Sequence, residues 1–300
     1  MVSVILPNYN HAKYLQERLD SIFSQRYKDF EVIILDDFST DNSKYILDSY
    51  KNHPQVSKII YNSRNSGNSY LQWYKGVEYA KGELVWIAES DDWSDSYFLE
   101  YLVPVFNNED ISLAFCQSVY VYGDHFPKPE QDNSNFIVRD GNEFISTEML
   151  GGNAIVNASS VLFRKASFTK VMHDGYLDLK FCGDWLLWMQ MMQLSNIAYF
   201  PAKMNYLRRH PGNITNKWRA RGLDLTEGLK VYRSGKKMIR EPYNKSNVYQ
   251  SWLNRFAKYK SSYSIPVLLK VTLVLMIREP TMAYYILTRY YKSKLKKILR

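Results

Sequence analysis

Two apolar runs, each followed directly by acidic residues, constrain most strongly what this chain can fold into. FEVIIL is followed by Asp36 and Asp37, and ELVWIA is followed by Glu89, Asp91 and Asp92. Short runs rich in β-branched and aromatic residues are typical of strands buried on both faces of a parallel sheet. Ligands of open parallel sheets bind beyond the carboxyl ends of the strands. Clustered carboxylates at such ends repel one another unless a cation or hydrogen-bond donors lie between them.

The first acidic strand end predicts a nucleotide site. In a βα turn, Asp and Ser side chains often satisfy helix amides, which would account for Ser39 and Asp41. It does not account for the adjacent Asp36 and Asp37 at the tip of a buried strand. A carboxylate there can accept a hydrogen bond from a pyrimidine imino group or from ribose hydroxyls.

The second acidic strand end predicts a metal site. Hard cations such as Mg²⁺ and Mn²⁺ are held by one or two carboxylates together with phosphate oxygens. The alternative is an acidic helix N-terminus before a helix that begins near Ser96. If the segment is extended, Glu89 and Asp91 share a face and Asp92 points away. Two acidic ends in one sheet favour the metal.

Strand and helix signals alternate over the first third of the chain. Strands are expected at 2–7, 30–35, 58–61 and 83–88, with helices after Asn10, at 41–51 and around 71–77. This alternation predicts βαβ units and an α/β fold with a mixed, mostly parallel sheet flanked by helices. Next come a helix at 98–106, a strand at 112–123 and a loop at 124–140. A mixed region with SSVLFR leads to an apolar helix at 185–194. Strands at 196–200 and 204–209 follow and are separated by Pro201. From about Ile214 onward the signals are helical and basic.

The positive charge belongs to the tail of the chain. The last twelve residues hold six basic and no acidic residues, and without them the net charge falls from +9 to +3. This placement argues against a nucleic-acid partner and favours an anionic surface. The two cysteines, Cys116 and Cys182, are expected to be free thiols in a reducing cytosol, because nothing resembling a secretory signal precedes the first strand.

Three motifs follow one another in the first third of the chain: VSVILPNYN, IILDDFSTDNS and NSGNSYLQWYKGVEYAKGELVWIAESDD. Together they resemble the family 2 glycosyltransferases of the GT-A fold, over roughly residues 2–215. The resemblance implies a nucleotide-sugar donor, foremost a UDP-sugar, a divalent metal (Mn²⁺ or Mg²⁺) and inversion at the anomeric carbon. It implies a nucleotide site made of Pro7, Tyr9, Asn10, Asp36, Asp37, Asn65, Gly67 and Asp91. Arg64 either neutralises the donor diphosphate or is an ordinary surface arginine, which is the simpler account. It also puts Asp91 and Asp92 at the metal, with Glu89 as the earlier acid of that motif.

The resemblance implies a catalytic base as well. Gly183-Asp184 before an apolar helix is an ordinary N-cap pattern. In the family the matching place usually carries Glu-Asp, whose Asp is the general base, and this chain has Gly183 where the Glu is common. A carboxylate positioned to take the proton of a sugar hydroxyl contributes about 10²–10⁴-fold in rate. Asp184 is therefore the expected base.

The stretch Tyr206–His210, with Asn213 and Thr215, resembles the close of the catalytic domain in many relatives. In some of them a His near this place meets the metal or the diphosphate, so His210 is a candidate ligand. Whether Glu89 or His210 ligates the metal stays open. Arg208 and Arg209 either pair with phosphate or form a solvated basic strand end. Residues 157–160 (NASS) are candidates for the acceptor side.

The C-terminal region suggests contact with a membrane surface. Residues 265–277 are the most apolar segment, but they are shorter than the ~20 residues of a spanning helix and contain Lys270. The terminal helix has Tyr291, Leu295, Ile298 and Leu299 on one face and its lysines on the other, as expected for a helix lying on anionic lipid. A solvated C-terminus is the alternative. The expected location is the cytoplasm, peripheral on the inner face of the plasma membrane.

The sequence thus predicts a metal-dependent inverting glycosyltransferase that acts on a saccharide or lipid-linked saccharide hydroxyl in surface polysaccharide synthesis. Residues 1–215 would be the GT-A catalytic domain and 216–300 a helical, basic region. One alternative is a GT-A-fold binding or scaffold protein without turnover, to which Gly183 points. A sugar nucleotidyltransferase is the other. It is disfavoured because no Gly-rich phosphate loop follows the first strand.

Overall fold

The computed structural model describes residues 1–123, 135–210, 212, 214–240 and 242–298. They form two compact units. Unit 1 comprises Met1–Asp140, Ile155–Leu177 and Leu194–His210, and unit 2 comprises Gly141–Ala154, Asp178–Gln193 and Pro211–Arg300. Two segments that precede residue 215 therefore group with the C-terminal helices. The division into domains at 215 and 216 stays a prediction.

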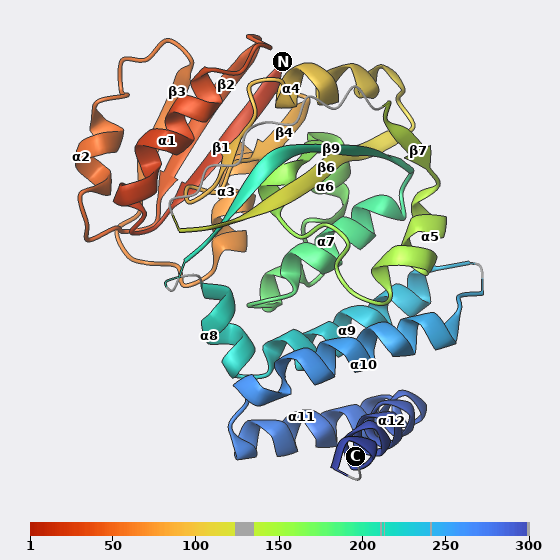
Figure 1. Cartoon of the computed structure of the whole chain (residues 1–300). Helices are drawn as coiled ribbons and strands as arrows, with labels where there is room; N and C mark the ends of the chain where they lie inside the picture. Colours follow the sequence, from red (N-terminus) through yellow and green to blue (C-terminus); the bar gives the residue numbers. More distant parts are fainter. Residues whose placement is uncertain (124–134, 211, 213, 241, 299–300) are drawn as a thin grey trace. The chain divides into compact units, whose positions relative to one another are not determined.

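Unit 1 is built on a mixed sheet (Figure 1). Its described strands are β1 (Val2–Asn8), β2 (Phe30–Asp36), β3 (Val56–Tyr61), β4 (Leu84–Ile87), β5 (Trp93–Ser94), β6 (Ile111–Tyr122), β7 (Ile137–Arg139), β8 (Val161–Arg164) and β9 (Asn196–Arg209). They lie in the order β3-β2-β1-β4-β8-β6-β9-β5, with β7 paired to β9. The first four strands pair in parallel, whereas β8 is antiparallel to β4 and β6. The predicted α/β fold is confirmed.

Helices cover both faces of the four parallel strands. One face packs Val4, Val32 and Trp86 against α1 (Ala12–Phe23), α2 (Ser43–Asp48) and α4 (Phe98–Leu102). Side chains alternate along a strand, so every second residue of these strands points to the opposite face. The helix α3 (Ser69–Tyr79) packs on that face. Gly76 of α3 lies so close to the sheet that a Cβ there would be 2.4 Å from Ile5 Cγ2. Only glycine permits this approach. The remaining short helices of unit 1 are η1 (Val103–Asn107), η3 (Ala158–Ser160), α6 (Lys165–Val171) and η4 (Tyr176–Asp178), whose last residue belongs to unit 2.

The predicted break at Pro201 is wrong, since β9 runs without interruption from Asn196 to Arg209. The ladder with β6 pairs Cys116 with Phe200 and Gln117 with Lys203, so Pro201 and the next residue lie in a register shift without partners on β6. A bulge of this kind accepts a proline, which has no N–H to give to the ladder. The strand therefore continues through a residue that usually ends one.

Unit 2 is helical, as predicted for the C-terminal region. It contains α5 (Gly141–Phe144), η2 (Ile145–Met149), α7 (Gly183–Met192), α8 (Ile214–Ala220), α9 (Leu223–Met238), α10 (Lys245–Tyr259), η5 (Lys260–Ser262), α11 (Ile265–Arg278) and α12 (Pro280–Ile298). Two buried tryptophans fix its core: the Trp185 indole donates to Met149 O and the Trp252 indole to Leu150 O, each at 3.0 Å. Such donors need partners when they are buried.

Cys116 and Cys182 are free, as predicted, and both are buried. Among the helices that the structure describes, none combines the length and apolarity needed to cross a bilayer. Most of the predicted loop at 124–140, Asn213, and the side chains of Leu295, Ile298 and Leu299 lie outside the described residues.

Candidate functional site

The tips of β1 and β2 are joined by side-chain hydrogen bonds. Asp36 is buried and accepts from Asn8 Nδ2 at 2.7 Å and from the Ser39 N–H at 2.9 Å. Asn10 Oδ1 accepts from the Thr40 N–H at 2.7 Å. Pro7 lies within β1, opposite Leu35 of β2. These bonds fix the first acidic strand end beside the end of β1.

Two aromatic side chains stand exposed at these same tips. Tyr9 follows β1, and Phe38 lies two residues beyond the end of β2. Phe38 has a φ of +67°, a left-handed conformation that costs a bulky residue free energy. A strained, exposed aromatic ring beside the predicted nucleotide residues is available to stack on a base.

Asp37 is a buried acceptor for the loop that follows β3. It accepts from Asn62 Nδ2 at 2.7 Å, from Ser66 Oγ at 2.7 Å and from Gln72 Nε2 at 3.0 Å. The loop between Asn62 and Ser66 carries the predicted Arg64 and Asn65, and Gly67 follows with a φ of +67°. The Asn65 side chain donates to the Asp37 carbonyl, while Arg64 is exposed. Asp37 therefore orders the predicted Arg64–Gly67 segment.

The second acidic strand end forms a turn, because the Asp92 N–H donates to the Glu89 carbonyl. The expectation of an extended segment is wrong, and the three carboxylates separate. Glu89 accepts from the Trp73 indole at 2.7 Å. Asp92 accepts from Asn157 Nδ2 and Ser159 Oγ, each at 2.8 Å. The predicted NASS segment thus contacts Asp92.

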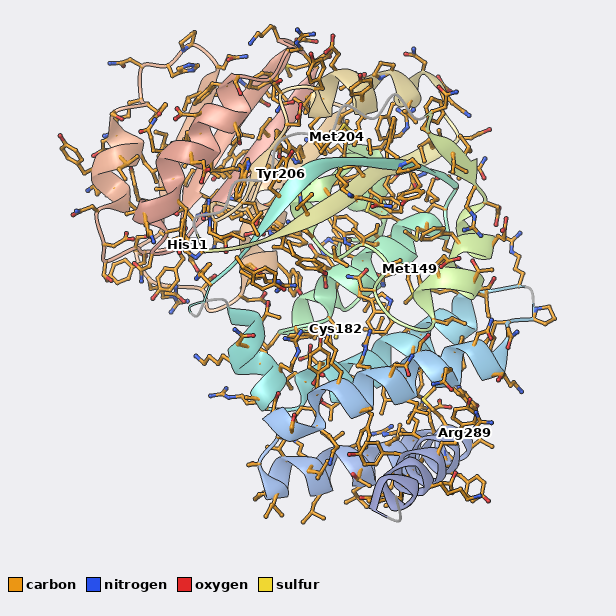
Figure 2. The ribbon with its side chains drawn as sticks, viewed as in Figure 1. His11, Met149, Cys182, Met204, Tyr206 and Arg289 are labelled. Atoms are coloured by element: carbon orange, nitrogen blue, oxygen red, sulfur yellow. The ribbon has the colours of Figure 1, made fainter. Side chains whose placement is uncertain are left out.

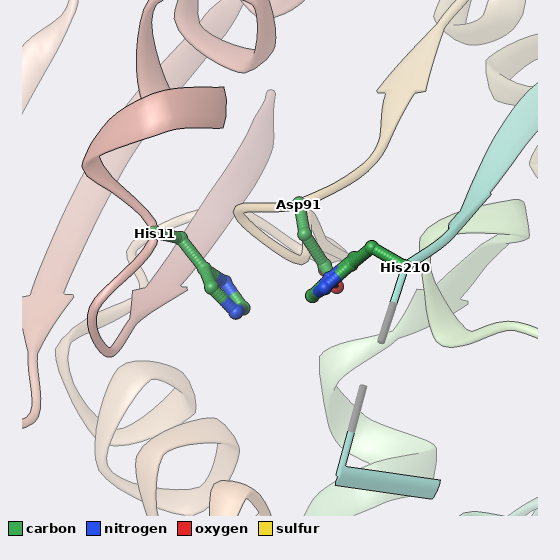
Figure 3. A group of neighbouring side chains, drawn as sticks. All are labelled: His11, Asp91 and His210. Atoms are coloured by element: carbon green, nitrogen blue, oxygen red, sulfur yellow. Dashed lines mark hydrogen bonds and ion pairs between the residues drawn. The ribbon is translucent and has the colours of Figure 1, made fainter. Parts of the chain in front are cut away.

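Asp91 faces two histidines. His11, Asp91 and His210 each offer a ligand atom within 4.8 Å of the others. Figure 3 shows the three side chains directed into one space, from the loop after β1, the turn after β4 and the end of β9. His210 Nε2 lies 3.2 Å from Asp91 Oδ2. His11 Nδ1 is 2.8 Å from Ser90 Oγ, which leaves its Nε2 for a ligand.

This donor set fits a divalent transition metal. Imidazole nitrogens together with a carboxylate suit Mn²⁺ better than Mg²⁺, which prefers oxygen ligands throughout. His210 belongs to the cluster, whereas neither Glu89 nor Asp92 does among the described residues. His11, a candidate ligand in this cluster, is not among the metal residues that the sequence predicts. Its position directly beyond β1, the strand next to β4, was the signal that pointed to it.

The three carboxyl groups near the cluster differ in the direction of their pKa shifts. Burial would raise the pKa of Asp91, but the hydrogen bond from His210 and the charges of His11 and His210 lower it overall. Burial and the Asp91 charge raise the pKa of Glu89 to about 8. The same two causes raise the pKa of Asp92. Asp91 is therefore the carboxylate that stays ionised and available to a cation.

A buried arginine lies among these acids. Arg18 of α1 is fully buried, donates to Ser94 Oγ at 2.9 Å and stacks 4.8 Å above the Trp86 ring. Burial lowers its pKa to about 10, and the charges of Asp92, Glu89 and Asp91 oppose that shift. It therefore remains a cation at neutral pH and offsets part of the negative charge.

The partners of Arg208 are protein groups around the Asp91 turn. Its guanidinium pairs with Glu17, donates from Nε to the Asp91 carbonyl at 3.2 Å and stacks on Tyr14 and Trp93. A side chain so engaged and buried supports the turn that holds Asp91. Arg209 stacks on Tyr120 instead.

Asp184 lies in the first turn of α7, in unit 2, two residues after Cys182, which Figure 2 labels. Its Oδ2 accepts from Asn153 Nδ2 at 2.9 Å. The N-terminus of α7 is held by the carboxylate of Glu227 on α9, which accepts from the N–H groups of residues 180, 181 and 182. The base role of Asp184 stays a prediction.

Comparison with known proteins places this geometry in a family. The family model described as "Glycosyl transferase family 2" matches residues 3–172. Glycosyltransferase GlyG of Streptococcus pneumoniae is 30% identical over 149 residues, which are 50% of this chain and 47% of GlyG. The chain thus spans about half the length of that relative.

Solved structures share the fold. Residues 1–349 of TarS from S. aureus, crystallised with UDP, superimpose with a TM-score of 0.63 at 18% identity, covering 98% of this chain and 91% of that chain. The mannosyltransferase PcManGT from Pyrobaculum calidifontis, in complex with GDP-Man and Mn²⁺, gives a TM-score of 0.56 at 18% identity, covering 99% and 87%. The fold expected from the sequence is confirmed.

Proposed function

Because this chain belongs to glycosyl transferase family 2, we propose that it moves a sugar from a nucleoside-diphosphate donor to a hydroxyl of a saccharide or lipid-linked saccharide acceptor. The reaction inverts the anomeric carbon and serves surface polysaccharide synthesis. The cluster of His11, Asp91 and His210 at the carboxyl ends of β1 and β4 is the observation that carries the proposal. The edge of the sheet where these strands end is where ligands of such sheets bind.

The donor would lie across the tips of β1 and β2. Tyr9 and Phe38 supply exposed rings for the base, and the segment Arg64–Gly67, ordered by Asp37, supplies the exposed Arg64 cation for the diphosphate. UDP is the foremost donor nucleotide, and the UDP complex of TarS supports it. GDP remains in the panel to be tested, because PcManGT was crystallised with GDP-Man.

His11, Asp91 and His210 would hold Mn²⁺ in preference to Mg²⁺. A bound Mn²⁺ would neutralise charge on the diphosphate as a Lewis acid. The residues themselves prepare the site: Ser90 orients the His11 ring, and the Asp91 carboxylate is kept ionised by the two histidines. The Mn²⁺ in the PcManGT complex supports this assignment.

Asp184 would act as the general base. Its carboxylate takes the proton of the acceptor hydroxyl, the hydroxyl oxygen forms a bond to the anomeric carbon, and the bond from that carbon to the diphosphate oxygen breaks. The hydrogen bond from Asn153 Nδ2 orients the carboxylate that would take the proton. A positioned base of this kind contributes about 10²–10⁴-fold.

The test is release of nucleoside diphosphate from a panel of UDP- and GDP-sugars with Mn²⁺ and candidate acceptors. Asp184→Asn should lose transfer by at least about 10²-fold while keeping donor affinity. Asp178→Asn, an exposed carboxylate shortly before α7, is the matched control and should keep both.

Three outcomes would contradict the proposal. Full transfer by Asp184→Asn would remove the assigned base. No turnover with any donor, despite nucleotide binding, would identify a scaffold protein. Release of pyrophosphate from a nucleoside triphosphate and a sugar phosphate, supplied in a parallel assay, would identify a nucleotidyltransferase.

A further inference from the structure

The outer face of α11 is apolar and exposed. Ile265, Leu269, Leu273, Met276 and Ile277 recur at helical spacing, and each is exposed, Ile265 by 76% and Ile277 by 67%. Together they form one stripe along the helix, which we call the α11 stripe. Contiguous exposed apolar surface of this kind marks a contact with another molecule or a membrane.

The opposite face of α11 is firmly packed. Val271 and Leu275 are 1% and 3% exposed. Gly222, between α8 and α9, has a φ of +73°, and a Cβ there would be 2.5 Å from Val271 Cγ2. The stripe therefore belongs to a helix that is fixed against the body of unit 2, so it cannot turn inward without losing this packing.

The part of the chain that contains the stripe is strongly cationic. From Pro242 to Arg300 the sequence holds twelve Lys and Arg residues and a single acidic residue, Glu279. Glu279 is buried and pairs with Lys236 at 2.7 Å, so the described residues 242–298 expose no acidic side chain. Lys270 and Arg278 lie on α11 itself, and exposed Arg289, labelled in Figure 2, lies on α12.

Two further cations, one on α8 and one on α10, line a pocket that includes residues just before α11. An open pocket of about 500 Å³ is lined by Asn216, Arg219, Lys258, Tyr259 and Ser262. Ser262 is three residues from Ile265, where the stripe begins. The N-terminal end of the stripe therefore adjoins a basic pocket.

We propose that the α11 stripe docks unit 2 on an anionic lipid bilayer, with the helix lying in the plane of the interface. A helix of 14 residues is about 21 Å long, too short to span the ~30 Å of hydrocarbon. Insertion to the level of the acyl-chain boundary buries the apolar side chains and leaves the flanking cations beside lipid phosphates.

A second copy of this chain fits the stripe less well. Self-association through a two-fold axis brings the same patch of both copies together. Lys270, Arg278 and Arg289 would then face their own duplicates with no exposed carboxylate from the same region to pair with, and like charges oppose such a contact. An anionic bilayer satisfies both the apolar stripe and the charge.

The structure assigns the contact to α11 and not to the terminal helix alone. On α12, Met282, Ile286 and Tyr290 are buried, so its apolar side is already used for packing, although Tyr284 and Tyr291 are exposed. α12 contributes cations near the stripe, whereas α11 contributes the apolar surface.

Flotation of the full chain with vesicles tests the proposal. Vesicles of mixed phosphatidylglycerol and phosphatidylcholine should bind it, and pure phosphatidylcholine should bind it far less. The double variant Leu269→Asn/Leu273→Asn should lower affinity by about tenfold or more per residue. Lys270→Gln should lower it roughly fivefold and weaken its salt dependence. The double variant Tyr45→Asn/Leu194→Asn, which removes exposed side chains of unit 1, is the matched control.

A fluorescent label distinguishes contact by the stripe from general attraction. The native cysteines are both buried, so Leu273→Cys offers one accessible thiol for an environment-sensitive dye. The dye should shift to the blue on anionic vesicles and be quenched by lipid-borne quenchers. The same dye on Tyr45→Cys should not respond.

Four results would overturn the proposal. They are absence of binding to anionic vesicles at low salt, binding that the Leu269/Leu273 variant leaves unchanged, a dye at residue 273 that stays in water, and a dimer that this variant dissolves in the absence of lipid. Circular dichroism of each variant shows that it is folded before binding is compared.

Discussion

Gln72 and Trp73 are adjacent on α3 and donate hydrogen bonds to two different acidic strand ends. Gln72 Nε2 lies 3.0 Å from Asp37 Oδ1, and Trp73 Nε1 lies 2.7 Å from Glu89 Oε1. The strands that lead to these acids, β2 and β4, are separated by β1 in the sheet. One turn of one helix therefore connects the predicted nucleotide end to the predicted metal end.

Replacing His11 by alanine should weaken Mn²⁺ binding by at least about tenfold, because even groups that only orient a metal ligand contribute that much. The measurement is titration of Mn²⁺ in the presence of UDP, followed by the electron paramagnetic resonance of free Mn²⁺. His173→Ala, an exposed histidine of unit 1, is the control and should bind as the unmodified chain does. Equal affinity of His11→Ala would remove His11 from the ligand set.

Glu89 should make stability fall as pH rises. Its pKa is about 8 in the folded chain against 4.5 for an unperturbed glutamate, mainly because it is buried. Between these values the folded state holds a proton that the unfolded state releases, so the free energy of unfolding decreases as pH rises from about 4.5 to 8. Glu89→Gln cannot ionise and keeps the acceptor for Trp73.

The stabilising effect of Glu89→Gln should therefore be small at pH 5 and larger at pH 8. Thermal unfolding of metal-free protein at both values measures it. Glu83→Gln, exposed at the start of the same apolar run, should show no such trend. A Glu89→Gln effect that does not grow with pH would contradict the raised pKa.

Phe38→Gly should produce two opposed effects. Glycine adopts a φ of +67° without strain, so the free energy of unfolding should rise by about 1 kcal/mol. Loss of the ring should weaken UDP binding, since stacking on a base contributes about 1–3 kcal/mol. Phe38→Ala separates the two, because it removes the ring but keeps a Cβ. Calorimetric UDP titration and urea unfolding measure both quantities, and unchanged UDP affinity in both variants would rule out stacking.

Glu227→Ala should destabilise the protein by about 3 kcal/mol or more, because three backbone N–H groups before α7 lose a buried acceptor. Glu227→Gln keeps an acceptor oxygen and should cost less. Lys230→Ala, exposed on the same helix, is the control. Urea unfolding gives the comparison. A Glu227→Ala variant as stable as the control would show that the α7 N-terminus is satisfied in another way.

The sequence predicts which strand ends carry the chemistry, because burial of both faces of β2 and β4 leaves a clear apolar run before each acidic end. It does not predict which carboxylate meets the histidines. That depends on the turn at Glu89–Asp92, which directs Asp91 and Asp92 to different partners. A tight turn of four residues leaves no periodicity from which side-chain directions can be inferred.

The surroundings of His11 and Pro201 also could not be predicted from the local sequence. His11 reaches the site because Asn10, with a φ of +55°, reverses the chain just before α1. Pro201 stays within β9 because it lies in a bulge of that strand, opposite β6, where no N–H is needed for the ladder. Both outcomes depend on pairing between residues that are distant in the sequence, so local composition cannot give them.

Gly76 sets how near α3 can come to β1, and Gln72 lies one turn before it on the same buried side of that helix. A single added methyl group at position 76 would lift the helix and draw the Gln72 amide and the Trp73 indole away from their acids together. The predicted nucleotide end and the predicted metal end would then both lose a hydrogen bond, although the added methyl group contacts neither of them. The proposed activity therefore depends on a missing side chain at position 76 as much as on the reactive groups.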